Sequence, residues 1–197
     1  MSKITNDEII DRAMSLIKEK GLSSFSLRDL AKEVGIKAPS MYKHFKGIDD
    51  INKIIALRLS DELNTCLKKA IANKHRDDAL IAIGETYRQF IEENTELYSI
   101  LLSMPDFKNE QIDQAALDTA SIIISVLNDY QFSPDQVVHL ERMYKSIIHG
   151  FFALTHAGYM THMEPSAKES DQASLQYYVY LVNALEKEAM NNDIKEK

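Results

Sequence analysis

The sequence predicts an all-α protein, and three observations support this class. Apolar residues recur every three or four positions along most of the 197 residues, which is the period of an amphipathic helix. The chain contains only 6 Gly and 4 Pro, so few residues interrupt long elements. Several short polar runs have the form of helix caps. About nine helices are expected: three short ones in an N-terminal domain over 1–48, a long connecting helix over 49–73, and a helical bundle over 74–197.

Two of the short N-terminal helices are separated by a glycine. Ser26 is placed to cap the first of them, and Gly35 to end it after about two turns. Pro39 fits the first turn of the next helix, where its missing N–H has no consequence. Met41 and Phe45 stand four apart and are expected to face inward. Two short helices joined by a tight glycine turn have helix-turn-helix spacing, and the second helix of such a unit enters the major groove of DNA.

The outward face of this second helix is basic and otherwise small. It carries Lys37, Ala38, Ser40, Lys43 and His44. Small residues let the backbone approach bases and phosphates closely, and the basic side chains favour contact with phosphate. The pattern predicts a local DNA-binding face in a chain whose net charge is -7.

Charge is unevenly distributed between the two parts of the chain. Residues 1–60 contain 11 Lys or Arg and 8 Asp or Glu, whereas residues 61–197 contain 12 and 22. The division indicates parts with different partners, of which only the first suits a polyanion. A surplus of three charges is small, so on charge alone nucleic-acid binding and chance composition are equal alternatives.

The remaining elements follow from helical periodicity and from caps. A capping box at Thr5–Glu8 opens the first helix, and Ser133 followed by a proline opens another. Residues 164–170 are expected to form a polar loop. The other helices are expected over 6–20, 78–93, 96–104, 109–130, 134–161 and 171–190.

Several classes of protein and site are disfavoured. The single cysteine, Cys66, excludes an intrachain disulfide framework and a zinc site with several cysteines, and it is expected to be buried in its helix. His149 and His156 are seven residues apart rather than four, so neither a metal site nor another cofactor is expected. The N-terminus lacks the apolar segment of a signal peptide, and no apolar run approaches the roughly 20 residues of a membrane helix. A cytoplasmic location without membrane contact is expected.

Residues 5–60 resemble the N-terminal domain of TetR-type transcriptional regulators. The similarity is densest over Leu30–Phe45, where identity and spacing agree at nearly every position. A second segment, Ile147–Met160, resembles the His-Gly segment of the WHG subgroup of regulatory domains. The matching residues of the N-terminal part are Ile9, Ala13, Gly21, Ser26, Leu27, Arg28, Asp29, Leu30, Ala31, Val34, Gly35, Ile36, Pro39, Ser40, Met41, Tyr42, His44 and Phe45.

The resemblance implies a dimeric repressor that binds a palindromic operator and is released by a small ligand. It implies dimerisation through the helices near 134–161 and 171–190. The sequence departs from the family pattern at Ile48, where family members usually have a lysine that contacts the DNA backbone. Lys46 is expected to make that contact instead. The roles implied are phosphate contact for Tyr42, Lys43 and His44, proximity to the backbone for Ser26 and Arg28, and contact with bases for Lys37, Ala38 and Ser40, with Pro39 allowing close approach.

Aromatic residues and methionines are numerous in the second part of the chain. Most are expected to form the core, yet helical bundles also hold apolar ligand cavities with a few polar groups between their helices. The residues expected to line such a cavity are Tyr87, Phe90, Tyr98, Met104, Phe107, Tyr144, His149 and Phe152.

Two other functions remain alternatives on the sequence. In one, the body binds a protein partner instead of a small ligand, as in an activator, and nothing in the sequence separates these cases. An all-helical enzyme is the more remote alternative, because no nucleophile triad, phosphate loop or metal spacing is present.

Overall fold

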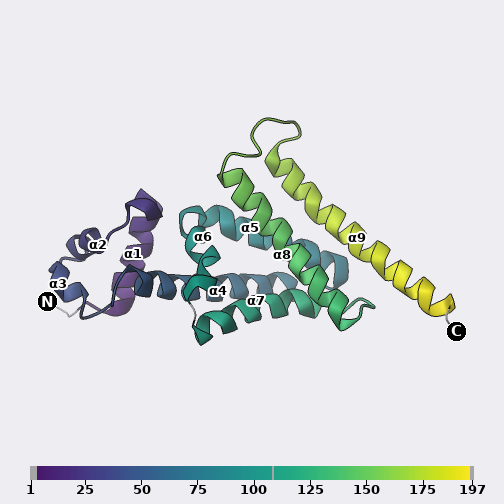
Figure 1. The fold of residues 1–197 in the computed structure, drawn as a ribbon, viewed down its shortest axis with the longest axis horizontal. Coiled ribbons are helices and arrows are strands. Elements are labelled where there is room, and N and C mark those ends of the chain that lie inside the picture. The colour runs from purple at the N-terminus through teal and green to yellow at the C-terminus, as the bar shows by residue number, and fades with distance from the viewer. Residues whose placement is uncertain (1–3, 108, 196–197) are drawn as a thin grey trace. The chain divides into compact units, whose positions relative to one another are not determined.

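The computed structural model describes residues 4–107 and 109–195, and helices joined by loops make up its described part, as Figure 1 shows. No strand occurs among the described residues, so the predicted all-α class with about nine helices is confirmed. The α-helices are α1 (Asn6–Lys20), α2 (Leu27–Glu33), α3 (Ala38–Met41), α4 (Ile48–Ile71), α5 (Arg76–Glu93), α6 (Thr95–Leu102), α7 (Glu110–Leu127), α8 (Pro134–His156) and α9 (Ala167–Lys195); two 3₁₀ turns are η1 (Leu22–Ser24) and η2 (Met104–Phe107).

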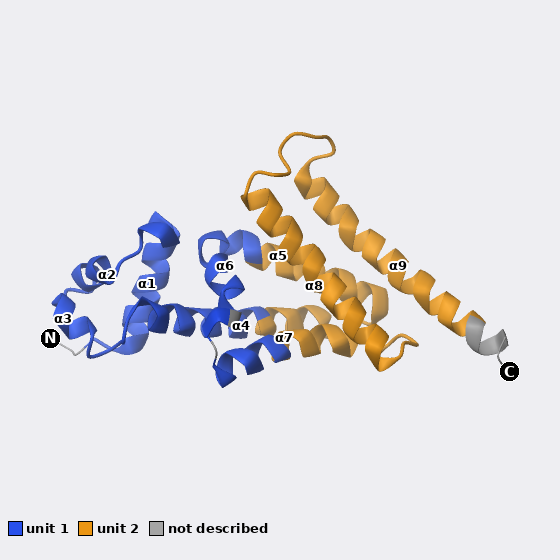
Figure 2. Ribbon diagram, viewed as in Figure 1, with its two compact units in different colours: residues 1–63, 91–117 blue, residues 64–90, 118–197 orange. Residues whose placement is uncertain are grey.

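The chain forms two compact units, which Figure 2 colours separately. The first unit comprises Met1–Leu63 and Ile91–Leu117, and the second comprises Asn64–Phe90 and Asp118–Lys197. α4, α5 and α7 each contribute residues to both units. The predicted division into a DNA-binding domain over 1–48 and a regulatory domain over 74–197 is a different grouping from these two units, and it stays a proposal.

The first unit contains the three-helix head, α1–α3. Thr5 and Glu8 form the predicted capping box: the amide of Glu8 donates to Thr5 Oγ1 at 3.2 Å, and the amide of Thr5 donates to Glu8 Oε2 at 2.7 Å. α1 packs against α2 and α6, and α2 packs against α3. The apolar stripes meet in a core of Ile9, Ile10, Ala13, Leu16, Ile17, Leu30, Ala31, Met41, Phe45, Ile51, Ile55 and Leu59, all at most 2 % exposed.

The second unit is built around buried faces of α5, α7, α8 and α9. Arg76, in a left-handed conformation with φ of 47°, lies with its guanidinium carbon 4.0 Å from the centroid of the Tyr130 ring and pairs with Glu186 of α9. Arg88 of α5 pairs with Asp171 at the start of α9. These two ion pairs join α5 to α9 near both ends of α5.

Three predicted boundaries of the last two helices are wrong, among them the end of α9, which lies at Lys195 and not near 190. α8 ends at His156 and not near 161, because Gly158 adopts a φ of 79° and ends the helix in a Schellman motif: the amide of Tyr159 donates to the Leu154 carbonyl at 2.9 Å. α9 begins at Ala167, inside the segment predicted as a loop.

The early start of α9 has a local cause in a further capping box. The amide of Glu169 donates to Ser166 Oγ at 3.3 Å, and the amide of Ser166 donates to Glu169 Oε2 at 3.0 Å. The hydrogen bonds from the side chain and backbone of Ser166 hold the pKa of Glu169 below its usual value. The spacing Ser-x-x-Glu was available in the sequence, but the polar composition around it suggested a loop.

The Ser166→Ala variant is expected to unfold at a lower urea concentration, with a loss of about 1 kcal/mol, because the cap hydrogen bond to the Glu169 amide disappears. Ser170→Ala, one turn further into α9, serves as the control and is expected to be near neutral. An equal effect of both substitutions would contradict a capping role for Ser166.

The expected burial of Cys66 is also wrong, because its side chain lies on an exposed face of α4. No helix among the described residues is long and apolar enough to cross a membrane.

Candidate nucleic-acid interface

The turn between α2 and α3 is set by backbone hydrogen bonds of Gly35 and its neighbours. Gly35 has a φ of 71°, which residues with a Cβ rarely adopt. The amide of Ile36 donates to the Ala31 carbonyl at 3.0 Å, and the amide of Gly35 donates to the Lys32 carbonyl at 3.2 Å. This is again a Schellman motif, and it turns the chain directly into α3. The predicted helix-turn-helix spacing therefore has a defined backbone basis.

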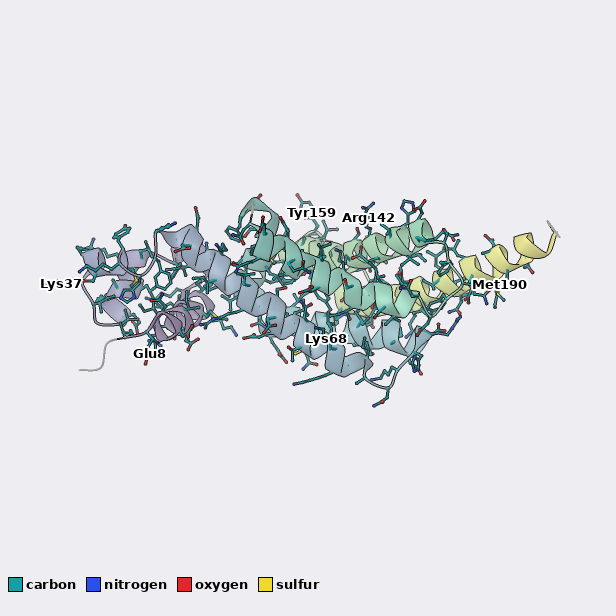
Figure 3. All side chains as sticks on the ribbon, turned by 90° about the horizontal axis from the view of Figure 1, so that it is seen from below. Glu8, Lys37, Lys68, Arg142, Tyr159 and Met190 are labelled. Atoms are coloured by element: carbon teal, nitrogen blue, oxygen red, sulfur yellow. The ribbon has the colours of Figure 1, made fainter. Side chains whose placement is uncertain are left out.

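α3 is a single turn whose inward face is buried and whose outward face is open. Met41 is 0 % exposed and Phe45 is 2 % exposed, as their spacing predicts, whereas the Tyr42 side chain is 64 % exposed. Lys37 precedes the helix without a side-chain cap, and Figure 3 shows it at the tip of the head. Of the residues predicted to meet DNA, Arg28, Lys37, Ala38, Pro39, Tyr42, Lys43 and Lys46 are exposed, and Ser26, Ser40 and His44 are half-buried.

Ser26 and His44 both have partners inside the head. The Ser26 hydroxyl accepts from the amide of Asp29 at 3.2 Å and so caps α2. His44 Nδ1 lies 2.7 Å from Asn6 Oδ1, and since a carbonyl oxygen can only accept, this nitrogen is the donor. Asn6 was not anticipated from the sequence, because 38 residues separate it from His44 and no local pattern connects them.

The residues predicted to line an effector cavity are divided between the units. Tyr98, Met104 and Phe107 belong to the first unit, where the first two are buried and the third is half-buried. The other five, Tyr87, Phe90, Tyr144, His149 and Phe152, belong to the second unit.

The structure brings Tyr87 and His149 together within the second unit. The Tyr87 hydroxyl lies 3.4 Å from His149 Nε2, and the two rings meet edge to face with centroids 5.5 Å apart. Burial, assisted by the charge of Lys145, lowers the pKa of His149 to about 4. The imidazole is therefore neutral near pH 7 and can act as both donor and acceptor.

Tyr144 and Phe152 lie beside other partners. The Tyr144 hydroxyl donates to the Leu80 carbonyl, and its ring centroid is 4.7 Å from that of Tyr178. Burial raises the pKa of Tyr144, so its hydroxyl stays protonated. Phe152 stacks on His156 with centroids 5.4 Å apart. Among the described residues no group of His, Cys, Asp or Glu is arranged to hold a metal ion.

Two family models match most of the chain. One, described as bacterial regulatory proteins of the tetR family, matches residues 9–53 and so includes α2, the turn and α3. The other, described as a tetracyclin repressor-like C-terminal domain, matches residues 80–177. The chain belongs to the TetR family of transcriptional regulators. Membership in this family answers the question of function class, since it makes the chain a regulator and not an enzyme.

Curated relatives agree with the TetR assignment. An uncharacterised HTH-type transcriptional regulator of Mycobacterium tuberculosis is 26% identical over 171 residues, covering 86% of this chain and 78% of the relative. A second such regulator, YobS of Bacillus subtilis, is 28% identical over 153 residues, covering 77% of this chain and 78% of the relative.

A solved TetR structure shares the fold. TetR-Q116A from Acinetobacter baumannii AYE, in complex with minocycline, superposes with a TM-score of 0.73 at 18% identity, covering 93% of this chain and 99% of that one. At this identity the likeness concerns the fold alone. Assignment to the WHG subgroup stays a prediction.

Proposed function

We propose that this TetR-family regulator is a homodimeric repressor that acts in the cytoplasm. It binds a palindromic operator through α2 and α3, and a small apolar or amphipathic ligand in the helical body releases it. The observation that carries the proposal is the group of exposed basic side chains, Lys37, Lys43 and Lys46, on the outer side of a helix-turn-helix. The 12 Lys or Arg against 22 Asp or Glu of residues 61–197 make the rest of the chain unsuited to phosphate contact.

Specific roles follow for the exposed segment. Tyr42, Lys43 and His44 hold phosphates, with Ser26 and Arg28 near the backbone at the start of α2. Lys37, Ala38 and Ser40 face the bases, and Pro39 allows the close approach. Lys46 takes the place of the backbone contact that Ile48 cannot make; its own amide donates to Asp50 Oδ2 at 3.2 Å near the start of α4.

The proposed dimer uses α8 and α9, which lie side by side. α9 exposes two tyrosines three residues apart, Tyr177 at 72% and Tyr180 at 76%, and Tyr159 after α8 is 78% exposed. Large aromatic side chains of this exposure are typical of protein interfaces. A dimer is also expected on symmetry grounds, since each head reads half of a palindrome.

Release requires that ligand binding change the geometry of the two heads. Half-sites lie one DNA turn, about 34 Å, apart, so a shift of α4 that changes this separation weakens operator binding. Coupling of this kind typically amounts to about 1–3 kcal/mol. The neutral pair Tyr87 and His149 suits hydrogen bonding to an uncharged polar group of the ligand, with apolar contacts from Phe90, Tyr144 and Phe152 of the same unit. The minocycline complex of the Acinetobacter protein makes a polycyclic amphipathic ligand a reasonable first probe.

Selection of bound sequences from a random pool of double-stranded DNA tests the proposal. The native protein is expected to enrich a palindrome, and the Tyr42→Ala, Lys43→Ala double variant is expected to lose it. Lys43→Ala alone should reduce the slope of log affinity against log salt by about 1, because one phosphate contact is removed. Enrichment of a sequence without two-fold symmetry would contradict the homodimer, and no enrichment would contradict operator binding.

A further inference from the structure

The first turns of α1 hold a side chain from α4. Arg58 of α4 reaches two carboxylates: its Nη2 lies 2.5 Å from Asp7 Oδ1, and its Nη1 lies 2.6 Å from Asp11 Oδ1. Asp7 and Asp11 are four residues apart, so they lie on one face of α1, one above the other. The planar guanidinium spans both, which fixes its direction more tightly than a single contact would.

The residue before Asp7 holds the segment after α3. Asn6 is the neighbour of Asp7 in the chain, and its Oδ1 accepts from His44 Nδ1 at 2.7 Å. His44 directly follows Tyr42 and Lys43, the pair proposed to meet phosphate. The N-terminus of α1 therefore carries contacts to α4 on one side and to the exposed basic segment on the other, and all of these residues belong to the first unit.

We propose that Arg58 is a positioning residue for DNA recognition. It sets the orientation of α1 on α4, and Asn6 passes that orientation to His44 and so to the phosphate-facing segment. The role rests on the proposed function, because it concerns how the head is presented to an operator. The buried apolar contacts of the head hold the helices together, but such contacts have little directional preference. The three polar contacts of 2.5, 2.6 and 2.7 Å supply the direction.

The exposure of the pairs separates this role from a merely stabilising one. The side chains of Asp7 and Asp11 are 86% and 69% exposed and that of Arg58 is 27% exposed, and ion pairs to such exposed carboxylates contribute little to the free energy of unfolding. Replacing Arg58 with lysine, which keeps the charge and an apolar stem, is therefore expected to leave the thermal midpoint almost unchanged. The substitution is expected to reduce the local order of the segment after α3 and the affinity for DNA.

Arg58→Lys is the decisive substitution, because it retains the positive charge and removes the planar guanidinium that contacts both carboxylates. The head offers a matched control in Arg12, which pairs with Glu33 and thereby joins α1 to α2 rather than to α4. Arg12→Lys makes the same chemical change in the same unit. Any general effect of replacing an arginine on α1–α4 or on attraction to DNA appears in both variants.

Amide hydrogen exchange in the free protein gives the first readout. The amides of Lys43, His44 and Phe45 donate to carbonyls of Ser40 and Met41, so their exchange reports how well this segment is held. Arg58→Lys is expected to speed their exchange about threefold or more, and Arg12→Lys to stay within about twofold of the native protein. Equal rates in the two variants would overturn the proposal.

A double-mutant cycle on the selected operator gives the second readout. Arg58→Lys and Asn6→Ala are each expected to weaken binding about fivefold, and the double variant no more than either, because both break one serial link. In the variant that combines Arg12→Lys with Asn6→Ala, the fold losses in operator affinity of the two single substitutions should multiply. If the losses from Arg58→Lys and Asn6→Ala multiply as well, the two contacts act independently and the proposal is wrong. If the native protein selects no DNA, operator binding fails as a function, and the exchange rates decide on the link by themselves.

Discussion

Gly84→Ala is expected to destabilise the protein by about 1 kcal/mol, although alanine is the better helix former. A Cβ at Gly84 of α5 would lie 2.5 Å and 2.6 Å from the methyl carbons of Leu175 and 2.8 Å from the Tyr144 hydroxyl. Leu175 can adjust at its end, but Tyr144 is 0 % exposed, donates to the Leu80 carbonyl and packs on Tyr178. Forcing an extra carbon into such a core costs about 1–3 kcal/mol, which outweighs a helix gain of about 1 kcal/mol.

Gly150→Ala in α8 is the matched control for this prediction. A Cβ there meets nothing within 4 Å, so only the helix preference acts and the variant gains about 0.5–1 kcal/mol. Urea unfolding of the two variants and the native protein measures both effects. A neutral or stabilising Gly84→Ala would mean that α9 does not pack against α5 as closely as Leu175 indicates. A lower free energy of unfolding for Gly150→Ala would indicate that another protein surface packs against α8 at this position.

The burial of His149 makes the free energy of unfolding depend on pH between about 6.5 and 4. The pKa of His149 is about 4 in the folded protein and 6.5 in the unfolded chain, so the unfolded chain binds the extra proton between these values. Stability therefore rises with pH across this window and is lost as the pH falls from 6.5 towards 4. A shift of this size corresponds to about 3 kcal/mol.

The measurement is urea unfolding at several pH values for native protein and His149→Gln. The difference between their free energies of unfolding is expected to change by about 3 kcal/mol from pH 7 to pH 4, since carboxylate titrations are common to both. His156→Gln, which removes an exposed histidine from the same helix, is the matched control for the loss of one imidazole. Parallel profiles for native protein and His149→Gln would show that His149 is not buried as described.

Helix positions are well predicted where the signal is local. The capping boxes that begin at Thr5 and Ser133 marked the starts of α1 and α8, and Gly35 follows the end of α2 as expected. The end of α8 was missed because a glycine in a helical pattern is often tolerated, and only the backbone shows Gly158 in a left-handed conformation. Cys66 was misjudged because its apolar neighbours Leu63 and Leu67 are buried, whereas Cys66 itself lies at the exposed edge of that stripe.

The basic segment of the candidate site could also be predicted from the sequence, because all of its residues lie within ten positions of one another. The residues that hold this segment in place could not be predicted. Asn6 lies 38 residues from His44, and Arg58 lies 47 and 51 residues from its two carboxylates, so no periodicity or spacing rule relates them. The pairing of Tyr87 with His149 across 62 residues has the same cause. Such contacts depend on how helices pack, which one sequence does not specify locally.

The shortness of α3 has a consequence for how such proteins diversify. Its four residues cannot be stable as an isolated helix, so its shape depends on Met41, Phe45 and the turn at Gly35. Lys37, Ala38 and Lys43 are exposed and make no part of that support. With the base-facing roles proposed above for Lys37 and Ala38, replacing these two changes which operator is recognised while the scaffold persists. Descendants of this protein can thus acquire new target genes by a few surface changes, without first having to evolve a new fold.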